Sequence, residues 1–218
     1  MIQHIAFIPD GNRHWAVAHG LPKVAGYPQS LKVIERCCYW AIDNKIPYIS
    51  FYCYSTENFE RRPRDEFNNF IELLTKYYHE HLNDYINAGI RVVFNGRKDR
   101  LPAEIITIVE DTEQKTLNGT NLTLVMCIDY GGRHEIVQAI EAGAKTEEEI
   151  SAFMQRNAPD PEIIVRTNNM RRLSNFMLWQ ASYSELFFLP QCFPDVTIED
   201  LNEILNEYYQ REKYYGGS

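Results

Sequence analysis

The sequence predicts an α/β protein with a mostly parallel, six-stranded sheet flanked by helices. Short apolar segments alternate along the chain with longer segments in which apolar residues recur every three or four positions. Strands that alternate with helices favour parallel pairing through right-handed crossovers. In addition, no linker and no internal repeat divides the 218 residues, so we expect a single domain over residues 1–218.

Six segments have the composition of buried strands. Each is rich in β-branched, aromatic or other apolar side chains, and in chain order they span 4–8, 46–55, 89–95, 121–130, 162–167 and 185–190. Ligands of open parallel sheets bind outside the carboxyl ends of the strands. The residues that follow each segment therefore define where we expect the site.

The longer segments between the strands have the periodicity of amphipathic helices. Helices that connect consecutive parallel strands cover both faces of the sheet. The expected helices span 29–44, 65–88, 102–117, 134–143 and 197 to about 214.

The composition argues against several classes of protein. The five cysteines are an odd number without a CxxC pair, which argues against a disulfide framework and a zinc site and favours a reducing cytoplasm. No apolar run approaches the length of a transmembrane helix, so we expect a soluble protein. The net charge of −8 argues against nucleic acid as a partner. Any bound anion must then be held by local clusters of positive charge.

Glycines, small polar residues and arginines follow five of the predicted strands. The segments are PDGNRHW, STENFERR, NGRKDR, DYGGRHE and RTNNMRRLS. Gly-containing loops expose backbone N–H groups and Arg supplies a forked donor, a combination that suits phosphate oxygens. A plain turn is the alternative for DYGGR, and a solvated charge run for RKDR. Because GxxxxGK[ST] and GxGxxG are both absent, the sequence argues against a P-loop or a dinucleotide site and predicts phosphate chemistry of another kind.

Five segments carry a resemblance to a known family. HIAFIPDGNRHWA, GLPKVAGY, FYCYSTENFERRP, DYGGRHEIV and RTNNMRRLSNFMLWQASYSELFF resemble, in this order, the signature segments of the cis-prenyltransferases, the undecaprenyl diphosphate synthase family. The resemblance covers nearly the whole chain. It implies an α/β fold with a hydrophobic tunnel, a homodimer, Mg²⁺ dependence, and extension of an allylic diphosphate with isopentenyl diphosphate. Membrane contact would be at most peripheral, through a lipid product.

Three residues are predicted to serve the metal ion and the proton transfer. Asp10 follows the first strand and suits Mg²⁺, which takes one or two carboxylates and fills its remaining positions with water and phosphate; a helix N-cap is its alternative role. The resemblance implies that Glu185 reaches the metal across the dimer interface and that Asn58 is the proton acceptor. An amide is a poor base, so we expect Asn58 to orient substrate or relay the proton, with an Asx-turn cap as the alternative.

The resemblance also implies a set of substrate-binding residues. Arg166, Arg172 and Ser174 would bind the isopentenyl diphosphate. The family pattern has one Arg before Pro where FERRP has two, so the choice between Arg61 and Arg62 is open. The remaining substrate-binding residues follow the first two strands and are Gly11, Asn12, Arg13, His14, Trp15, Lys23, Tyr27, Ser55, Thr56, Glu57 and Phe59.

Departures from the family pattern keep more than one function open. Asn168, Asn169 and Met170 stand where the family has two glycines and an acid, while Tyr27 replaces a histidine and His14 an arginine. Similar changes occur in relatives that join two allylic units head to middle and give lavandulyl-type products. A terpene cyclase that ionises one prenyl diphosphate is a further possibility, and so is a noncatalytic partner subunit.

Bulky residues suggest a short or medium-length product. They would close the tunnel early if they line it, and otherwise they are core aromatics that touch no substrate. The residues are Tyr52, Tyr54, Tyr77, Tyr78 and Met126.

Overall fold

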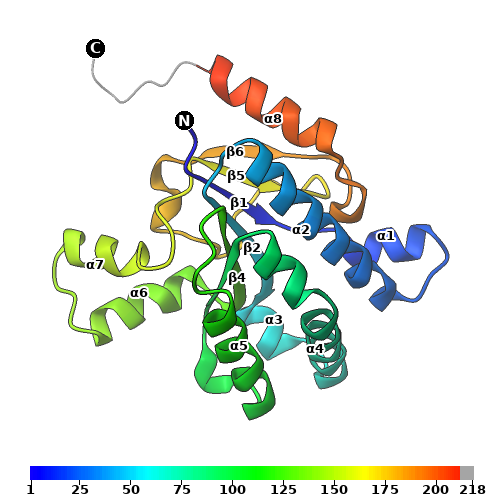
Figure 1. The fold of residues 1–218 in the computed structure, drawn as a ribbon, viewed down its shortest axis with the longest axis horizontal. Helices are drawn as coiled ribbons and strands as arrows, with labels where there is room; N and C mark the ends of the chain where they lie inside the picture. The colour runs from blue at the N-terminus through cyan, green and yellow to red at the C-terminus, as the bar shows by residue number, and fades with distance from the viewer. Residues whose placement is uncertain (212–218) are drawn as a thin grey trace.

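The computed structural model describes residues 1–211 and contains one sheet of six parallel strands (Figure 1). The strand order is β3-β4-β2-β1-β5-β6, and each neighbouring pair is parallel. The predicted fold class and all six predicted strands are confirmed. The strands are β1 (His4–Ile8), β2 (Tyr48–Ser55), β3 (Ile90–Asn95), β4 (Leu122–Tyr130), β5 (Ile163–Arg166) and β6 (Glu185–Phe188).

Eight α-helices connect and cover the strands within residues 1–211. The five predicted helices are confirmed as α2, α4, α5, α6 and α8, and the predicted extension of the last one to Tyr214 lies outside the described residues. None of the helices of residues 1–211 combines the length and apolar character that a bilayer crossing demands. The helices are α1 (Asn12–Ala18), α2 (Gly26–Asp43), α3 (Thr56–Arg61), α4 (Arg64–Asn87), α5 (Ala103–Lys115), α6 (Gly132–Glu141), α7 (Glu147–Met154) and α8 (Ile198–Gln210).

Three short helices, α1, α3 and α7, were not predicted. At seven, six and eight residues, each is too short to show a repeating apolar face. Two of them begin at side-chain caps. The Ser55 hydroxyl accepts a hydrogen bond from the Asn58 N–H at 3.0 Å, and Thr146 and Glu149 form a reciprocal capping box. Local capping therefore determines where α3 and α7 start.

Two apolar clusters hold the sheet. The larger contains residues of α2, α4, α5 and α8, and at its centre Phe7 of β1 stacks on Phe51 of β2 with ring centroids 5.1 Å apart. The smaller includes Phe176 and Met177, and the Phe176 ring stacks on that of Tyr52 with centroids 4.6 Å apart. Burial of each large apolar side chain stabilises the fold by roughly 1.5–3 kcal/mol. The central strands are thus firmly held, and the loops at their carboxyl ends start from fixed positions.

The register of the central strands brings three of these loops together. Ile8, the last residue of β1, lies opposite Arg166, the last residue of β5. On the other side of β1, Phe7 lies opposite Phe51 of β2, and β2 continues for four more residues to Ser55. The loops that follow β1, β2 and β5 therefore leave the sheet side by side (Figure 1).

Candidate active site

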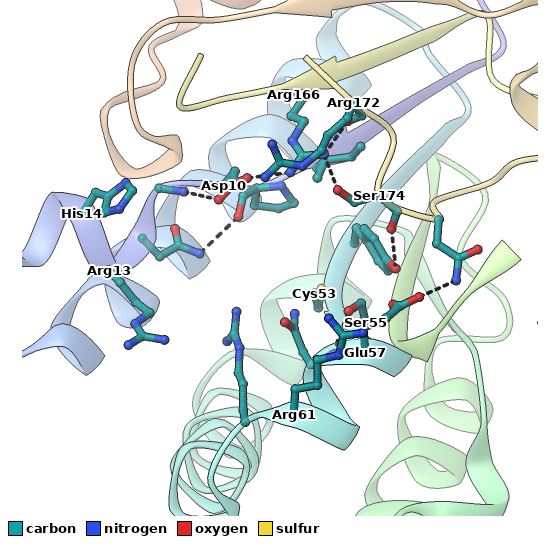
Figure 2. A pocket seen from close by; sticks show the side chains of 18 of the residues that line it. Asp10, Arg13, His14, Cys53, Ser55, Glu57, Arg61, Arg166, Arg172 and Ser174 are labelled. Atoms are coloured by element: carbon teal, nitrogen blue, oxygen red, sulfur yellow. Dashed lines mark hydrogen bonds and ion pairs between the residues drawn. The ribbon is translucent and has the colours of Figure 1, made fainter. Parts of the chain in front are cut away.

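A cavity of about 950 Å³ opens where β1, β2 and β5 end (Figure 2). In the described part of the chain, its wall carries seven Arg and Lys side chains and two carboxylates, Asp10 and Glu57. Because the whole chain has a net charge of −8, this local excess of positive charge favours a polyanionic ligand. The basic residues are Arg13, Lys23, Arg61, Arg62, Arg133, Arg166 and Arg172.

Asp10 lies on the cavity wall and is held from several sides. Its Oδ1 accepts a hydrogen bond from the Gly11 N–H at 2.9 Å, and its Oδ2 contacts the Arg166 guanidinium at 2.8 Å. The Thr167 hydroxyl accepts from the Asp10 N–H at 2.9 Å and donates to the Asp10 carbonyl at 2.7 Å. Of the Asp10 side chain, 33% remains exposed. The carboxylate is therefore oriented by the protein and still accessible from the cavity.

The turn after Asp10 requires glycine. Gly11 has a φ of 95°, and a Cβ atom there would lie 2.8 Å from the Cys192 sulfur and 3.0 Å from the Asn168 Cβ. An L-residue would meet both backbone strain and a steric clash. Helix α1 starts directly after this turn and places Arg13 on the cavity wall.

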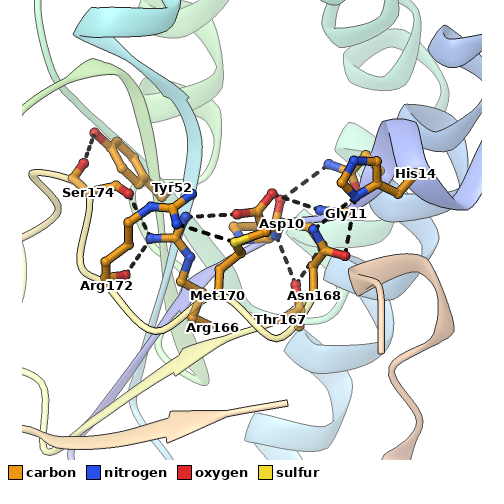
Figure 3. Close-up of polar contacts among 12 residues, drawn as sticks. Asp10, Gly11, His14, Tyr52, Arg166, Thr167, Asn168, Met170, Arg172 and Ser174 are labelled. Carbon is orange, nitrogen blue, oxygen red and sulfur yellow. Dashed lines mark hydrogen bonds and ion pairs between the residues drawn. The ribbon is translucent and has the colours of Figure 1, made fainter. Parts of the chain in front are cut away.

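Arg166 organises the loop that follows β5 (Figure 3). Only 5% of its side chain is exposed, and its Nη1 donates to the Ser174 hydroxyl at 2.7 Å and to the Arg172 carbonyl. Its Nε has no hydrogen-bond partner within residues 1–211. Arg172 itself is exposed, and its guanidinium contacts the Met170 sulfur at 3.3 Å, which is a weak acceptor. Arg166 thus ties the segment that presents Arg172 and Ser174 to Asp10.

This loop follows a left-handed backbone path at several positions. Asparagine adopts that conformation more readily than most residues other than glycine. Asn168 and Asn169, which stand where the family pattern has glycines, therefore keep a backbone that glycine would also allow. Asn168 in addition contacts the His14 ring at 3.1 Å (Figure 3). The left-handed residues are Asn168 (φ 62°), Asn169 (φ 53°), Ser174 (φ 50°), Asn175 (φ 67°) and Met177 (φ 43°).

The facing wall of the cavity includes residues of α1, α2 and α3 (Figure 2). Glu66 of α4 pairs with Arg13 at 3.3 Å and with Arg62 at 3.8 Å. Arg62 also donates to the Tyr27 hydroxyl at 3.0 Å. Arg61 lines the same cavity, is exposed, and forms no hydrogen bond or ion pair with another residue of the described chain. Arg62 is thus anchored, whereas Arg61 is available to a ligand.

The start of α3 places Asn58 on the cavity wall. Ser55 is the N-cap of this helix, and Asn58 contributes its backbone N–H to that cap. The Asn58 side-chain amide has no hydrogen-bond partner among the described residues, so the alternative role as a capping residue does not apply. Its neighbour Glu57 accepts a hydrogen bond from the Asn175 amide at 2.8 Å.

Four predicted site residues do not line this cavity. Trp15 donates its ring N–H to Asp195 at 2.7 Å. Phe59 packs beneath the Arg100 guanidinium, 4.5 Å from its ring centroid, and the Thr56 hydroxyl is buried without a partner in the described chain. The four residues are Trp15, Thr56, Phe59 and Glu185.

Glu185 lies at the amino end of the edge strand β6. It pairs with Ile163 of β5, whereas Arg166, which contacts Asp10, lies three residues further along. Three residues of strand span roughly 10 Å. The Glu185 carboxylate is bonded to Arg211 at 2.6 Å. Within one protomer, Glu185 and Asp10 are therefore not brought together.

Several cavity residues were not predicted. Arg133 lies in DYGGRHE, a segment that did indicate an anion site. Asn175 and Cys53 gave no signal, because their places depend on how distant segments pack. Burial raises the pKa of the Cys53 thiol to about 12, so this thiol is a neutral part of the wall. The others are Ile8, Pro9, Val17 and Leu178.

Most of the bulky residues considered for chain-length control lie away from the cavity. Of the five, Tyr52 lines it. Tyr54 stacks on Phe70 of α4 at 5.1 Å in the larger cluster, and Tyr78 donates to Asp111 of α5. These contacts favour the interpretation of Tyr54 and Tyr78 as packing residues. Closure of an apolar tunnel stays a prediction.

The donors on the wall suit a magnesium ion. Among residues 1–211, no group of three His, Cys, Asp or Glu side chains is arranged to hold a metal ion, as a structural zinc site would require. Mg²⁺ instead takes one or two carboxylates together with substrate phosphates and water. Asp10 fits such an ion, because its carboxylate lies on the cavity wall and is partly exposed.

Known protein sequences match the chain over nearly its full length. The family model described as "Putative undecaprenyl diphosphate synthase" matches residues 8–216. An isoprenyl transferase of Thermotoga maritima is 34% identical over 226 residues, which cover 99% of this chain and 97% of that protein. A ditrans,polycis-undecaprenyl-diphosphate synthase of Micrococcus luteus, named as (2E,6E)-farnesyl-diphosphate specific, is 34% identical and is covered to 91%, with 99% of this chain aligned.

Two solved structures have a similar fold. A probable undecaprenyl diphosphate synthase from Campylobacter jejuni has a TM-score of 0.85 and 29% identity, with 100% of this chain and 99% of that chain covered. Lavandulyl diphosphate synthase from Lavandula x intermedia, in complex with dimethylallyl diphosphate, has a TM-score of 0.93 and 24% identity, with 99% and 98% covered. The second likeness concerns the fold alone.

Proposed function

Since the chain belongs to the undecaprenyl diphosphate synthase family and is a prenyltransferase, we propose that it extends an allylic prenyl diphosphate with isopentenyl diphosphate. The observation that carries the proposal is the division of basic side chains between two sides of one cavity. Arg166 and Arg172 lie on one side with Asp10, and Arg13 and Arg61 lie on the other (Figure 2). Two diphosphates can be bound facing each other in this arrangement.

The two substrates are assigned to the two sides as the family resemblance implies. Arg61 and Lys23 are exposed on the cavity wall and are assigned to the allylic diphosphate together with Arg13. Arg172 and Ser174 are assigned to the isopentenyl diphosphate. Arginine suits both places, because its planar fork matches two phosphate oxygens at once.

The reaction breaks the bond between the allylic carbon and its diphosphate oxygen. A new carbon–carbon bond forms to the isopentenyl double bond, and the isopentenyl unit then loses a proton. Negative charge grows on the departing diphosphate, and preorganised guanidinium groups stabilise it. A magnesium ion at Asp10 would supply further stabilisation of that charge.

Asn58 is assigned to the proton-transfer step. Its side-chain amide lines the cavity without a partner among the described residues. An amide cannot accept a proton efficiently near neutral pH, so the assigned role is to orient the isopentenyl unit or to relay the proton to water or diphosphate.

The active form is proposed to be a cytoplasmic homodimer. Glu185 lies on the edge strand β6 and, in its own protomer, roughly 10 Å along the sheet from the level of Arg166, which contacts Asp10. A carboxylate in that place is better able to serve the metal ion of a partner subunit than that of its own.

The product is proposed to be short or medium in length. Cys53 belongs both to the cavity wall and to the margin of the larger apolar cluster. Next to it, Tyr54 stacks on Phe70 and packs edge-on against Phe67, with centroids 5.1 Å and 5.4 Å apart. A long prenyl chain would need these aromatic rings to move, whereas a short one would not.

Irregular coupling of two allylic diphosphates is a second candidate. The observation that favours it is the contact of Arg172 with the Met170 sulfur, at a position where the family pattern has an acid. Without a carboxylate beside Arg172, the site assigned to isopentenyl diphosphate is less specialised for that one substrate.

Product analysis tests these proposals. The protein is incubated with Mg²⁺ and dimethylallyl, geranyl or farnesyl diphosphate, each with and without isopentenyl diphosphate, and the dephosphorylated products are identified by mass spectrometry. Linear products that require isopentenyl diphosphate are the expected result, and their mass gives the chain length. Branched or cyclic products from allylic substrate alone would instead support irregular coupling or cyclisation.

A further inference from the structure

We propose that Asn175 is a positioning residue that couples the isopentenyl diphosphate loop to the helix that carries Asn58; this inference rests on the proposed function. Asn175 directly follows Ser174 and lines the same cavity. Its carbonyl group and the two ends of its side-chain amide are bonded to two different elements, α6 and α3.

The first link is to the start of α6. The Asn175 carbonyl accepts from the Gly132 N–H at 2.7 Å, and its Oδ1 accepts from the Arg133 N–H at 3.0 Å. The N-cap residue of α6, Gly131, has no side chain that could cap the helix. Asn175 therefore supplies the cap from a loop more than 40 residues away. The first turn of α6, with Arg133, is thereby fixed relative to Ser174.

The second link is to α3. The Asn175 Nδ2 donates to the Glu57 Oε1 at 2.8 Å. A hydrogen bond to a carboxylate is stronger than one between neutral groups, and both residues are half-buried. Glu57 lies in the first turn of α3, directly before Asn58. Asn175 thus links the residue next to Ser174 to the residue next to Asn58.

The site is shaped for this amide. A Cβ atom on Gly131 would lie 2.7 Å from the Asn175 Nδ2, so glycine leaves the space that the amide occupies. Asn175 has a φ of 67°, which asparagine tolerates better than most side chains. A longer amide such as glutamine would not fit between α3 and α6 without displacing one of them.

This geometry lets Asn175 relate the isopentenyl diphosphate site to the proton-transfer step. Ser174, which is assigned to the isopentenyl diphosphate, accepts a hydrogen bond from Arg166 through its hydroxyl and from Tyr52 through its carbonyl. The segment assigned to that diphosphate is therefore already held in place, and its next residue holds α3. Asn58 is then in place at the moment when the isopentenyl unit must lose its proton.

The isosteric substitution Asn175→Asp tests the proposal. It keeps an oxygen for the Arg133 N–H but places a second carboxylate against Glu57, so a donor is lost and two like charges meet. We expect kcat/KM for isopentenyl diphosphate to fall about 10- to 100-fold near pH 8, while KM for the allylic substrate stays within about twofold. The loss should shrink toward about pH 6, because the two carboxylates then share a proton.

A rescue experiment separates the Glu57 contact from general damage. Glu57→Gln in the Asn175→Asp background restores one donor and one acceptor with their roles exchanged. The double variant should therefore recover to within about fivefold of Glu57→Gln alone. Effects of the two substitutions that simply add would overturn the proposal.

Matched controls make the result specific. Asn169→Asp is the same change in the same loop, at a residue with a φ of 53° that is exposed and does not line the cavity; it should leave both KM values unchanged. Calorimetric titration with isopentenyl diphosphate alone measures its binding without turnover. It should show weaker binding to Asn175→Asp than to the unmodified protein. Thermal unfolding of every variant reports stability separately.

A second variant covers the case in which Asn175→Asp does not fold. Asn175→Gly keeps the left-handed backbone and removes both side-chain bonds. It should therefore weaken the binding of isopentenyl diphosphate, and Glu57→Gln should not restore that binding. Equal losses for both substrates would overturn the inference. Absence of any product from the unmodified protein would instead overturn the proposed function, so the two failures are distinguishable.

Discussion

The Arg166 guanidinium contacts the Asp10 carboxylate at 2.8 Å, and this one ion pair joins the two strand ends that carry the proposed metal ligand and the second diphosphate site. The same guanidinium holds the Ser174 hydroxyl. Arg166 is almost fully buried, whereas Asp10 is partly exposed. The pair therefore keeps the proposed metal site and the loop in a fixed relation before any substrate binds.

Replacement of Asp10 by alanine is expected to lower turnover about 1,000-fold or more, because it removes the proposed metal ligand and leaves Arg166 without its carboxylate. Steady-state rates at saturating Mg²⁺ measure the effect. Asp99→Ala is the control, since Asp99 pairs with Arg97 outside the cavity. A loss of less than tenfold for Asp10→Ala would contradict the assignment.

Arg172→Ala should raise KM for isopentenyl diphosphate about 10- to 100-fold and leave KM for the allylic substrate nearly unchanged, because an exposed guanidinium that binds diphosphate is lost. Arg171→Ala provides the matched control: Arg171 is also exposed but does not line the cavity. Initial rates at varied concentrations of each substrate give the two KM values. A rise in the allylic KM instead would mean that the two sites have been exchanged.

Arg61→Ala and Arg62→Ala should act on different properties. Arg61 has no partner among the described residues, so its loss should raise KM for the allylic substrate about tenfold or more. Arg62 is bonded to Tyr27 and Glu66, so its loss should lower the free energy of unfolding by about 1 kcal/mol with a smaller effect on KM. Kinetics and denaturant unfolding are both measured. The opposite pattern would make Arg62 the substrate ligand.

His4 should make the folded protein less stable in acid. Burial lowers the pKa of its imidazole from 6.5 to about 4, and both ring nitrogens are bonded, to the Pro159 carbonyl and the Ser50 hydroxyl. Below pH 6.5 the imidazole becomes protonated in the unfolded chain, whereas in the folded chain it stays neutral down to about pH 4. The free energy of unfolding should therefore fall by about 3 kcal/mol as the pH drops from 6.5 to about 4, and be unaffected by His4 above that range.

Urea unfolding between about pH 4 and 7.5 measures this contribution. Other groups titrate over the same range, so His4→Asn is compared with the unmodified protein, and the difference between the two curves isolates the imidazole. The exposed His79 provides the control His79→Asn. A difference that does not vary with pH would show that the pKa of His4 is the same in the folded and unfolded chains, and would contradict this prediction.

The parts of the fold that could be predicted from the sequence are those that repeat. The six strands and five helices each bury enough side chains to leave a pattern of apolar residues. Helices α1, α3 and α7 leave none, because a helix of six to eight residues is set by its cap or by its neighbours. The left-handed backbone at Asn168 and Asn169 was not predicted either. The two amides were interpreted as a change in substrate binding, whereas asparagine also adopts the left-handed conformation that the loop has here.

The candidate site was predictable where residues act through their own chemistry. Asp10, Arg166 and most of the other basic residues follow the strands, and strand ends meet at one edge of a parallel sheet. Glu66 and Asn175 could not be predicted, because each acts by joining segments far apart in the chain. Asn175, for example, meets Glu57 across 118 residues, and no local pattern records such a contact.

The position of Glu185 on β6 has a genetic consequence. If each metal site takes Asp10 from one subunit and Glu185 from the other, homodimers of Asp10→Ala and of Glu185→Ala are both defective at every site. A mixed dimer of these two variants contains one intact site and one that lacks both carboxylates. Two inactive alleles should then complement each other, up to about a quarter of the normal number of sites after random subunit exchange.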